Sequence, residues 1–183
     1  MKNQKKGKLF AKVKILCACA ILSAAAVTIA YVCKFMTLGS IRITFENIPI
    51  IFAGIFFGPV AGFATGVCAD LISTAFSQYG IGGINPLITL GAGVIGLTAG
   101  FVFRIKPLNK KHGLRLTLSV FSAHVIGNMI IKSIALMIYF SYPLPAVLPR
   151  IPLYTVIALI ELTAISVLMK SKGMQNAINS LKK

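Results

Sequence analysis

The sequence predicts an all-α integral membrane protein, a bundle of six transmembrane helices whose N and C termini both lie in the cytoplasm. Three features predict it: an apolar composition, a series of long apolar stretches, and basic residues that lie mainly between those stretches. Of the 183 residues, 57% are hydrophobic and 12% are charged, whereas soluble domains average roughly 25% charged. The length suits one domain, so we expect a single membrane domain over 1–183 with basic cytoplasmic ends at 1–14 and 170–183.

Several apolar stretches are long enough to enter a membrane. They cover residues 15–36, 46–75, 85–104, 117–141 and 146–169. The first follows a lysine-rich start, as the apolar part of a secretory signal peptide does. Its run from Ile15 to Val32 is nevertheless long enough to span a bilayer, and further stretches follow. We therefore expect it to be retained as the first transmembrane helix.

The basic residues determine the number of passes. Lys and Arg cluster at 2–14, 104–115 and 170–183, and loops rich in these residues stay in the cytoplasm. All three clusters can lie inside only if the stretch 46–75 crosses twice. Gly58-Pro59 provides the break, because proline cannot continue a helical hydrogen-bond ladder and restricts the residue before it. The sequence thus predicts two short helices joined at Gly58-Pro59 and six passes in total.

Glycines recur every four residues through this predicted hairpin and again in the next stretch. Their positions are Gly54, Gly58, Gly62, Gly66, Gly96 and Gly100. Small residues at this spacing allow two helix backbones to approach closely. We expect the glycines to serve tight packing inside the bundle.

Several functional classes are disfavoured. The chain carries 19 Lys+Arg against 3 Asp+Glu, but its basic residues flank apolar stretches and do not form the water-exposed basic face of a nucleic-acid binder. The cysteines lie in or beside apolar stretches without the spacing of a zinc site. There is no P-loop and no arguable Ser-His-Asp arrangement. We expect no catalytic residues, no metal site and no ATP hydrolysis by this chain.

Four basic residues lie outside the cytoplasmic clusters, and six passes put all of them in the outer half. They are Lys34, Arg42, Lys132 and Arg150. Lys34 can extend to the interface from the end of the first helix. Lys132 lies within a predicted helix, where an ionisable side chain is costly and normally faces a cavity or a partner.

Polar residues at helical spacing predict where such a cavity lies. The stripes are His124, Asn128, Lys132 and Tyr139; Arg150, Tyr154 and Glu161; and Asn85 and Thr89 with Gly93. They predict a pocket between 85–104, 117–141 and 146–169 that opens outward. The alternative is a structural network, such as Lys132 with Asp70 or Glu161. We favour the pocket for Lys132 and Asn128, and a structural role for His124 and Glu161.

The predicted pocket has a definite chemical character. Arg42, Lys132 and Arg150 would supply positive charge, and arginine binds a carboxylate in a bidentate fork. Aromatic and amide side chains belong to the same side: Phe45, Phe76, Tyr79, Tyr139, Tyr154, Asn85 and Asn128. Cations, aromatic faces and amides together suit a flat ring system that carries carboxylates.

Four segments carry a resemblance to a known family. The run IRITFENIPIIFAGIFFGPVAGFATGVCADLI (41–72) resembles the second and third helices of the folate-specific substrate-binding components of energy-coupling factor (ECF) vitamin transporters. NPLITLGAGVIGLTAG (85–100) and HVIGNMIIKSIALMIY (124–139), followed by PRIPLY (149–154), extend the likeness. It covers roughly 15–170. The hairpin around Gly58-Pro59 is shared with components for other vitamins, so the family is better supported than the substrate.

This resemblance implies a subunit of the bacterial plasma membrane that captures folate outside the cell. It binds no cofactor; its partners are a transmembrane coupling subunit and two cytoplasmic ATPases. In the family an Ala-x-x-x-Ala motif on the first helix contacts the coupling subunit, and here Ala20/Ala24 and Ala26/Ala30 both fit. For a folate ligand we assign Arg42 and Arg150 to the carboxylates, Asn128 and Lys132 to other polar groups, and Tyr154 to stacking.

Three alternatives remain open. The same machinery could carry another vitamin, such as pantothenate or a queuosine precursor. A secondary transporter that works alone would depend on an ion gradient. A membrane enzyme would need a catalytic group, for which Asp70 is the one candidate, and we expect Asp70 to be structural.

Overall fold

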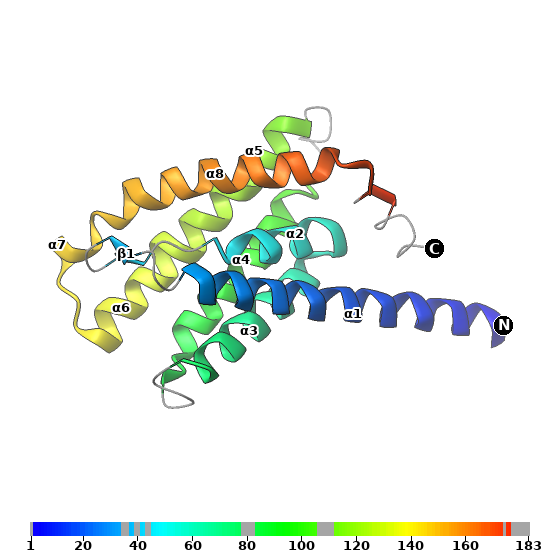
Figure 1. Cartoon of the computed structure of the whole chain (residues 1–183), viewed down its shortest axis with the longest axis horizontal. Coiled ribbons are helices and arrows are strands. Elements are labelled where there is room, and N and C mark those ends of the chain that lie inside the picture. The colour runs from blue at the N-terminus through cyan, green and yellow to red at the C-terminus, as the bar shows by residue number, and fades with distance from the viewer. Residues whose placement is uncertain are drawn as a thin grey trace.

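The computed structural model describes residues 2–33, 37–38, 41–42, 45–77, 83–105, 112–173 and 175–176. Within these ranges the protein is helical apart from a minimal ribbon (Figure 1). The helices are α1 Lys2–Val32, α2 Asn47–Phe57, α3 Pro59–Ala75, α4 Pro86–Val102, α5 His112–Ala123, η4 His124–Ile131, α6 Lys132–Phe140, α7 Leu144–Val147 and α8 Arg150–Lys170. The ribbon, which we did not predict, pairs β1 Thr37–Leu38 with antiparallel β2 Ile41–Arg42.

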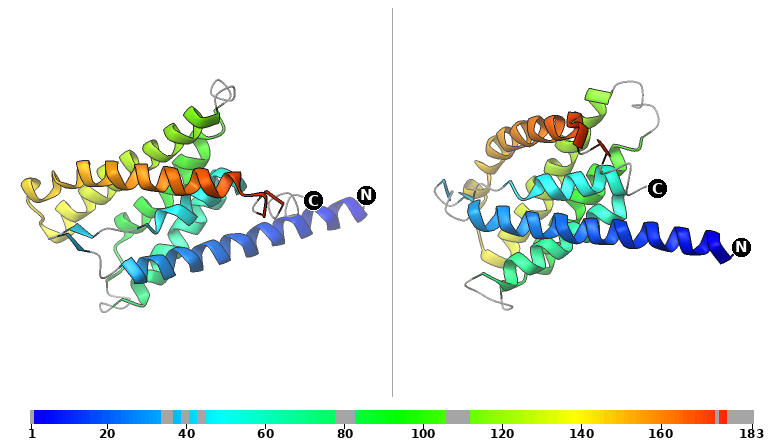
Figure 2. Two further views of the ribbon diagram at one scale, coloured as in Figure 1. Left: turned by 45° about the horizontal axis from the view of Figure 1, so that its top comes forward. Right: turned by 45° about the vertical axis from the view of Figure 1, so that its right-hand side comes forward.

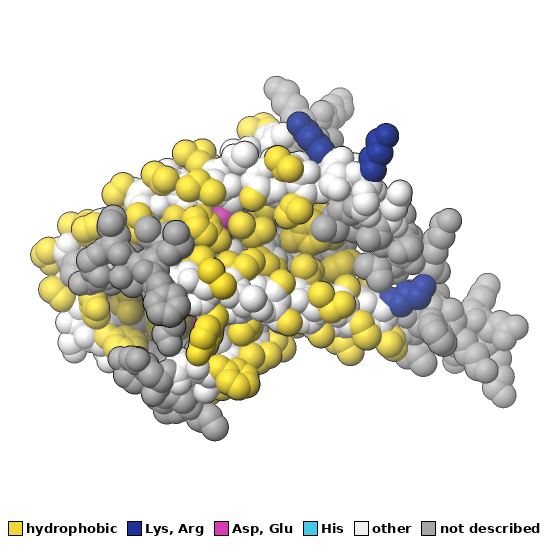
Figure 3. Space-filling model, viewed as in Figure 1, with side chains coloured by type: hydrophobic (Ala, Val, Ile, Leu, Met, Phe, Trp, Pro, Cys, Tyr) yellow, Lys and Arg dark blue, Asp and Glu magenta, His cyan; other side chains and the backbone are white. Residues whose placement is uncertain are grey.

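The long helices run between two ends of the molecule. The start of α1 and the end of α8 lie at one end, and the β1–β2 ribbon and α7 lie at the other, in all three views (Figures 1 and 2). On the face seen in Figure 3, hydrophobic side chains cover the middle, and the visible Lys and Arg side chains gather at the end where α1 begins. This distribution matches the expected grouping of the basic ends.

The predicted break at Gly58-Pro59 is confirmed. Helix α2 ends at Phe57 and α3 begins at Pro59, the first helical position, where the missing N–H of proline has no cost. Gly58 between them has φ 122° and ψ 164°, a conformation that essentially only glycine adopts without strain. Its N–H donates to the Gly54 carbonyl and closes α2.

Three helical segments are long and apolar enough to cross a membrane: Lys12–Val32, Gly113–Phe140 and Arg150–Lys170. Helices α2, α3 and α4 are apolar but have 11, 17 and 17 residues. At 1.5 Å per residue, α2 is about 16 Å long, roughly half of a hydrocarbon core of about 30 Å. Most of α2 is buried in the bundle. Six full crossings therefore remain a prediction.

Close backbone contact joins α2, α3 and α4, as the glycine spacing predicted. A methyl group added to Gly96 would overlap the backbone of Gly62, and one added to Gly54 would overlap the carbonyl oxygen of Gly96. Gly100 meets Gly54 in the same way. The Arg104 guanidinium then bonds the carbonyls of Gly54 and Gly100, each at 3.1 Å. These three helices form one tightly packed unit.

The predicted helix 117–141 is one rod from His112 to Phe140, but its middle is not α-helical. The eight residues His124–Ile131 form the π-helix η4. A π-helix has more residues per turn than an α-helix and is frequent at functional sites. Gly127 within η4 packs directly on Ile95 of α4. The π-helix could not be read from apolar periodicity.

Gly96→Ala should destabilise the protein strongly, because its new methyl group meets backbone that cannot move aside. Overpacking of this kind costs about 1–3 kcal/mol. Gly113→Ala is the matched control, since a methyl group there meets nothing within 4 Å among the residues that the structure describes. Thermal unfolding in detergent should show a lower midpoint for the first variant only; equal midpoints would contradict the backbone contact.

Candidate functional site

A cavity of about 300 Å³ opens between α3, α4, α6 and α8 and the start of α2. This volume is at the lower end of the range of about 300–1,000 Å³ typical of ligand pockets. The residues that line it are Glu46, Asp70, Ser73, Thr74, Ile88, Lys132, Leu136, Tyr142, Arg150 and Tyr154. Most are polar, ionisable or aromatic, whereas many large apolar side chains are exposed elsewhere on the described helices.

Arg150 and Tyr154 form one wall of the cavity at the start of α8. The Arg150 guanidinium carbon lies 5.1 Å from the Tyr154 ring centroid, within cation–π range. Arg150 Nη2 donates to the Tyr154 hydroxyl at 3.4 Å. Arg150 Nε is buried and has no hydrogen-bond partner among the described residues. A buried guanidinium N–H without an acceptor is costly, and the Arg150 side chain that carries it lines the cavity.

Lys132 faces the cavity from the first turn of α6. Its Nζ lies 3.7 Å from Glu46 Oε1, just before α2, and both side chains are partly buried. This contact joins α6 to the start of α2. The alternative of a structural network paired Lys132 with Asp70 or Glu161. The carboxylate that lies 3.7 Å from Lys132 belongs instead to Glu46.

Asp70 enters the cavity from α3 and is held by α4. The Thr89 hydroxyl donates to Asp70 Oδ2 at 2.7 Å. Asn85 caps α4, because its side-chain oxygen accepts from the backbone N–H groups of Leu87 and Ile88. Asn85 and Thr89 are thus buried supports next to the cavity and are not among the residues that line it.

A buried polar chain includes His124, whose ring centroid lies 6.3 Å from that of Tyr154. Asn47 Nδ2 donates to Glu161 Oε1 at 3.4 Å, and His124 Nε2 lies 2.8 Å from Glu161 Oε2. Asn128 Nδ2 lies 3.0 Å from His124 Nδ1. With Asn128 donating to Nδ1, the imidazole carries its proton on Nε2 and donates it to Glu161. These four residues join α2, η4 and α8, which agrees with the structural role favoured for His124 and Glu161.

The remaining predicted ligand residues lie elsewhere. Asn128 is fully buried under the cavity. Tyr139 is 56% exposed and does not line the cavity; seven residues past Lys132 it is about 10 Å further along the helix, beyond the rim. Phe45 is partly buried before α2, outside the lining residues. The Arg42 backbone belongs to β2, and its side chain, like all of Lys34 and Tyr79, lies outside the described residues.

Two acidic residues line the cavity that the sequence did not lead us to place there, Glu46 and Asp70. Glu46 was not considered, and Asp70 was treated as a structural residue. The signal was present in the composition, because the whole chain has only 3 Asp+Glu. Carboxylates are costly in a membrane and usually mark function. Tyr142, beyond the predicted stripe, was missed because it follows the end of α6.

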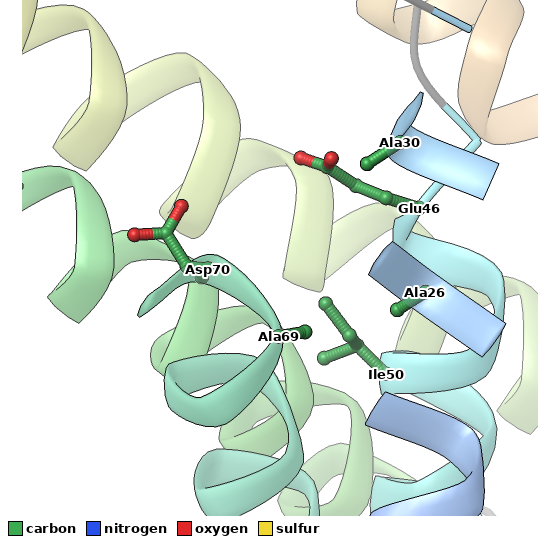
Figure 4. A pocket seen from close by; sticks show the side chains of 7 residues that line it. Ala26, Ala30, Glu46, Ile50, Ala69 and Asp70 are labelled. Atoms are coloured by element: carbon green, nitrogen blue, oxygen red, sulfur yellow. The ribbon is translucent and has the colours of Figure 1, made fainter. Parts of the chain in front are cut away.

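The two alanine pairs of α1 point to different sides. Ala26 and Ala30 are each 1% exposed, and they meet Ile50 and Ala69 around a small gap, where Figure 4 shows them packed against α2 and α3. Ala20 and Ala24 are exposed. One pair therefore belongs to the interior of the bundle, and the other lies on an open face of α1.

A family model described as "ECF transporter, substrate-specific component" matches residues 14–180. The chain belongs to this family. It is therefore a membrane-embedded transporter subunit, not an enzyme, of the kind that binds a small-molecule substrate and joins the subunits of an ECF module. A search of curated proteins found no match.

The buried pair of His124 and Glu161 should be strongly coupled. His124→Leu leaves the Glu161 carboxyl in an apolar interior without its nearest partner, and breaking a buried pair costs about 3–5 kcal/mol. Replacing both residues with leucine removes the unmet group, so the double variant should unfold at a higher temperature than His124→Leu alone. Thermal unfolding in detergent measures this; single effects that simply add would contradict the coupling.

Proposed function

We propose that this subunit captures folate outside the cell for uptake driven by ATP hydrolysis on two partner ATPases. The observation that carries the proposal is the wall of Arg150 and Tyr154, where a cationic guanidinium, one N–H of which has no partner among the described residues, lies beside an aromatic ring. Folate combines a flat pterin, a benzoate linker and a glutamate with two carboxylates. A carboxylate fits Arg150, and an aromatic ring fits Tyr154.

The proposed orientation rests on family membership and on the position of the start of α1 and the end of α8, which lie at the same end of the molecule (Figure 1). If the chain crosses the membrane six times, the start of α1 and the end of α8 lie in the cytoplasm. The cavity then opens to the outside of the cell. The start of α8, which carries Arg150 and Tyr154, lies beside α7, at the opposite end of the molecule from the start of α1 (Figure 1). Arg42 remains a second proposed carboxylate ligand, and Asn85, Thr89 and Asn128 act as supports of the cavity.

Docking on the coupling subunit is proposed to use Ala20 and Ala24. Both are exposed on α1, whereas Ala26 and Ala30 already pack within the bundle. Small side chains on an open helix face allow a partner helix to come close. This choice separates two pairs that have the same spacing in the sequence.

Arg150→Ala should weaken folate binding about ten- to a hundredfold, because a charge-assisted hydrogen bond contributes about 1.5–3 kcal/mol. Calorimetry on the purified subunit in detergent measures this. Lys170→Ala, at the other end of α8 and exposed, is the control and should bind as the wild type does. Competition with pantothenate and a queuosine precursor tests the cargo; tighter binding of either would exclude folate as the preferred ligand.

Ala24→Trp should abolish co-purification with the coupling subunit and folate uptake, while the isolated subunit still binds folate. A bulky ring on the docking face keeps the partner helix away. Ile21→Trp is the control, since Ile21 is also exposed but lies about 60° around the helix and about 4.5 Å along it from Ala24. Normal assembly of Ala24→Trp would show that coupling uses another face.

A further inference from the structure

Tyr142 lines the cavity although its helix ends before it. Helix α6 ends at Phe140, and the next residue, Ser141, has φ 50° and ψ 33°. Ser141 is the one non-glycine residue with a positive φ among the described residues. Side chains other than glycine adopt this conformation rarely, and backbone strain of this kind gathers at ligand sites. The turn therefore points to a functional constraint on the residue that follows it.

A continued helix would place Tyr142 on another side of α6. Tyr142 follows Tyr139 by three residues, and residues at this spacing are neighbours on one helix face. Tyr139 is 56% exposed and lies outside the cavity. In the structure, by contrast, Tyr142 is partly buried and lines the cavity. The change of backbone direction at Ser141 thus brings Tyr142 to the ligand site.

The backbone of Tyr142 is held on both sides. The N–H groups of Ser141 and Tyr142 both donate to the Leu136 carbonyl, that of Tyr142 at 3.3 Å. Pro143 follows, with φ −68° and ψ 148°, and a proline restricts the residue before it to extended conformations. The Leu136 side chain lines the same cavity. Tyr142 is therefore presented to the cavity by backbone that is already ordered before a ligand binds.

We propose that the Tyr142 ring contacts an aromatic ring of the ligand, and that the left-handed turn at Ser141 presets its position. This inference rests on the proposed function, because folate carries two aromatic units, the pterin and the benzoate. Tyr154 lies against Arg150, where the carboxylate is proposed to bind. Tyr142 precedes α7 and Tyr154 follows it, so the cavity offers a second aromatic side chain from a different segment. Two aromatic side chains suit a ligand with two rings better than pantothenate, which has none.

Calorimetry with folate on purified variants in detergent tests the contact. Tyr142→Leu should weaken folate binding about two- to tenfold, the range expected for an aromatic contact. Tyr142→Phe keeps the ring and should bind within about twofold of the wild type. Tyr139→Leu is the matched control, because it removes an aromatic side chain three residues away that lies outside the cavity, and it should leave the affinity unchanged.

Two variants of the exposed residue Ser141 test the turn. Ser141→Thr keeps the hydroxyl but adds a β-branch, which is strongly disfavoured at positive φ, so it should weaken folate binding. Added to Tyr142→Leu, it should cause no further loss, because both changes act through one contact. Ser141→Gly accepts the same backbone conformation and should bind within about twofold of the wild type. A role of Ser141 that is independent of Tyr142 would instead give losses of affinity that add.

The outcomes separate this inference from the proposed function. If the wild type does not bind folate, both fall. If folate binds and Tyr142→Leu keeps the wild-type affinity, folate capture stands and the role of Tyr142 is overturned. If Tyr142→Phe loses as much affinity as Tyr142→Leu, the hydroxyl makes the contact and the inference is overturned. If the losses from Ser141→Thr and Tyr142→Leu add, or Ser141→Thr causes none, the presetting by Ser141 is overturned.

Discussion

Backbone contact between α2, α3 and α4 is the constraint on which the rest of the protein depends. Gly54, Gly62 and Gly96 bring the three helices so close that no side chain fits between them. Lipid provides no hydrophobic drive for helices to associate, so close van der Waals packing must hold them together. The same contact fixes α3 against α4 and thereby sets Thr89 beside Asp70. The position of Asp70 beside Thr89 is therefore a consequence of the glycine packing between α3 and α4.

In the interior of the bundle, the Glu161 and Glu46 carboxylates each lie close to a hydrogen-bonding or oppositely charged side chain. Beneath the cavity, Glu161 receives hydrogen bonds from His124 and Asn47. Within the cavity, Glu46 faces Lys132. Buried ion pairs add little net stability, but losing one partner is strongly destabilising. The arrangement therefore fixes which helices can sit next to one another: η4 against α8 and α2, and α6 against the start of α2.

Sequence reasoning predicted what depends on composition and local chemistry. Apolar stretches and basic clusters located the helices, and the proline rule located the break at Gly58-Pro59. Lys132, Arg150 and Tyr154 line one cavity, as the sequence predicted. The reason is that an ionisable side chain in an apolar helix normally faces the bundle interior or a water-filled cavity. The β1–β2 ribbon, η4 and the distinction between two alanine pairs could not be predicted. They depend on how a helix is rotated and packed, which spacing alone leaves undetermined.

The mixture of charges also bears on how such a site can release its ligand. A cavity with Lys132 and Arg150 alone would be left with uncompensated cations in the membrane each time an anionic ligand departed, at a high cost. Glu46 is positioned to neutralise Lys132 when the site is empty. Binding of the proposed anionic ligand would then exchange one partner of Lys132 for another. A subunit that must both capture and surrender its cargo needs that balance more than it needs the tightest possible site.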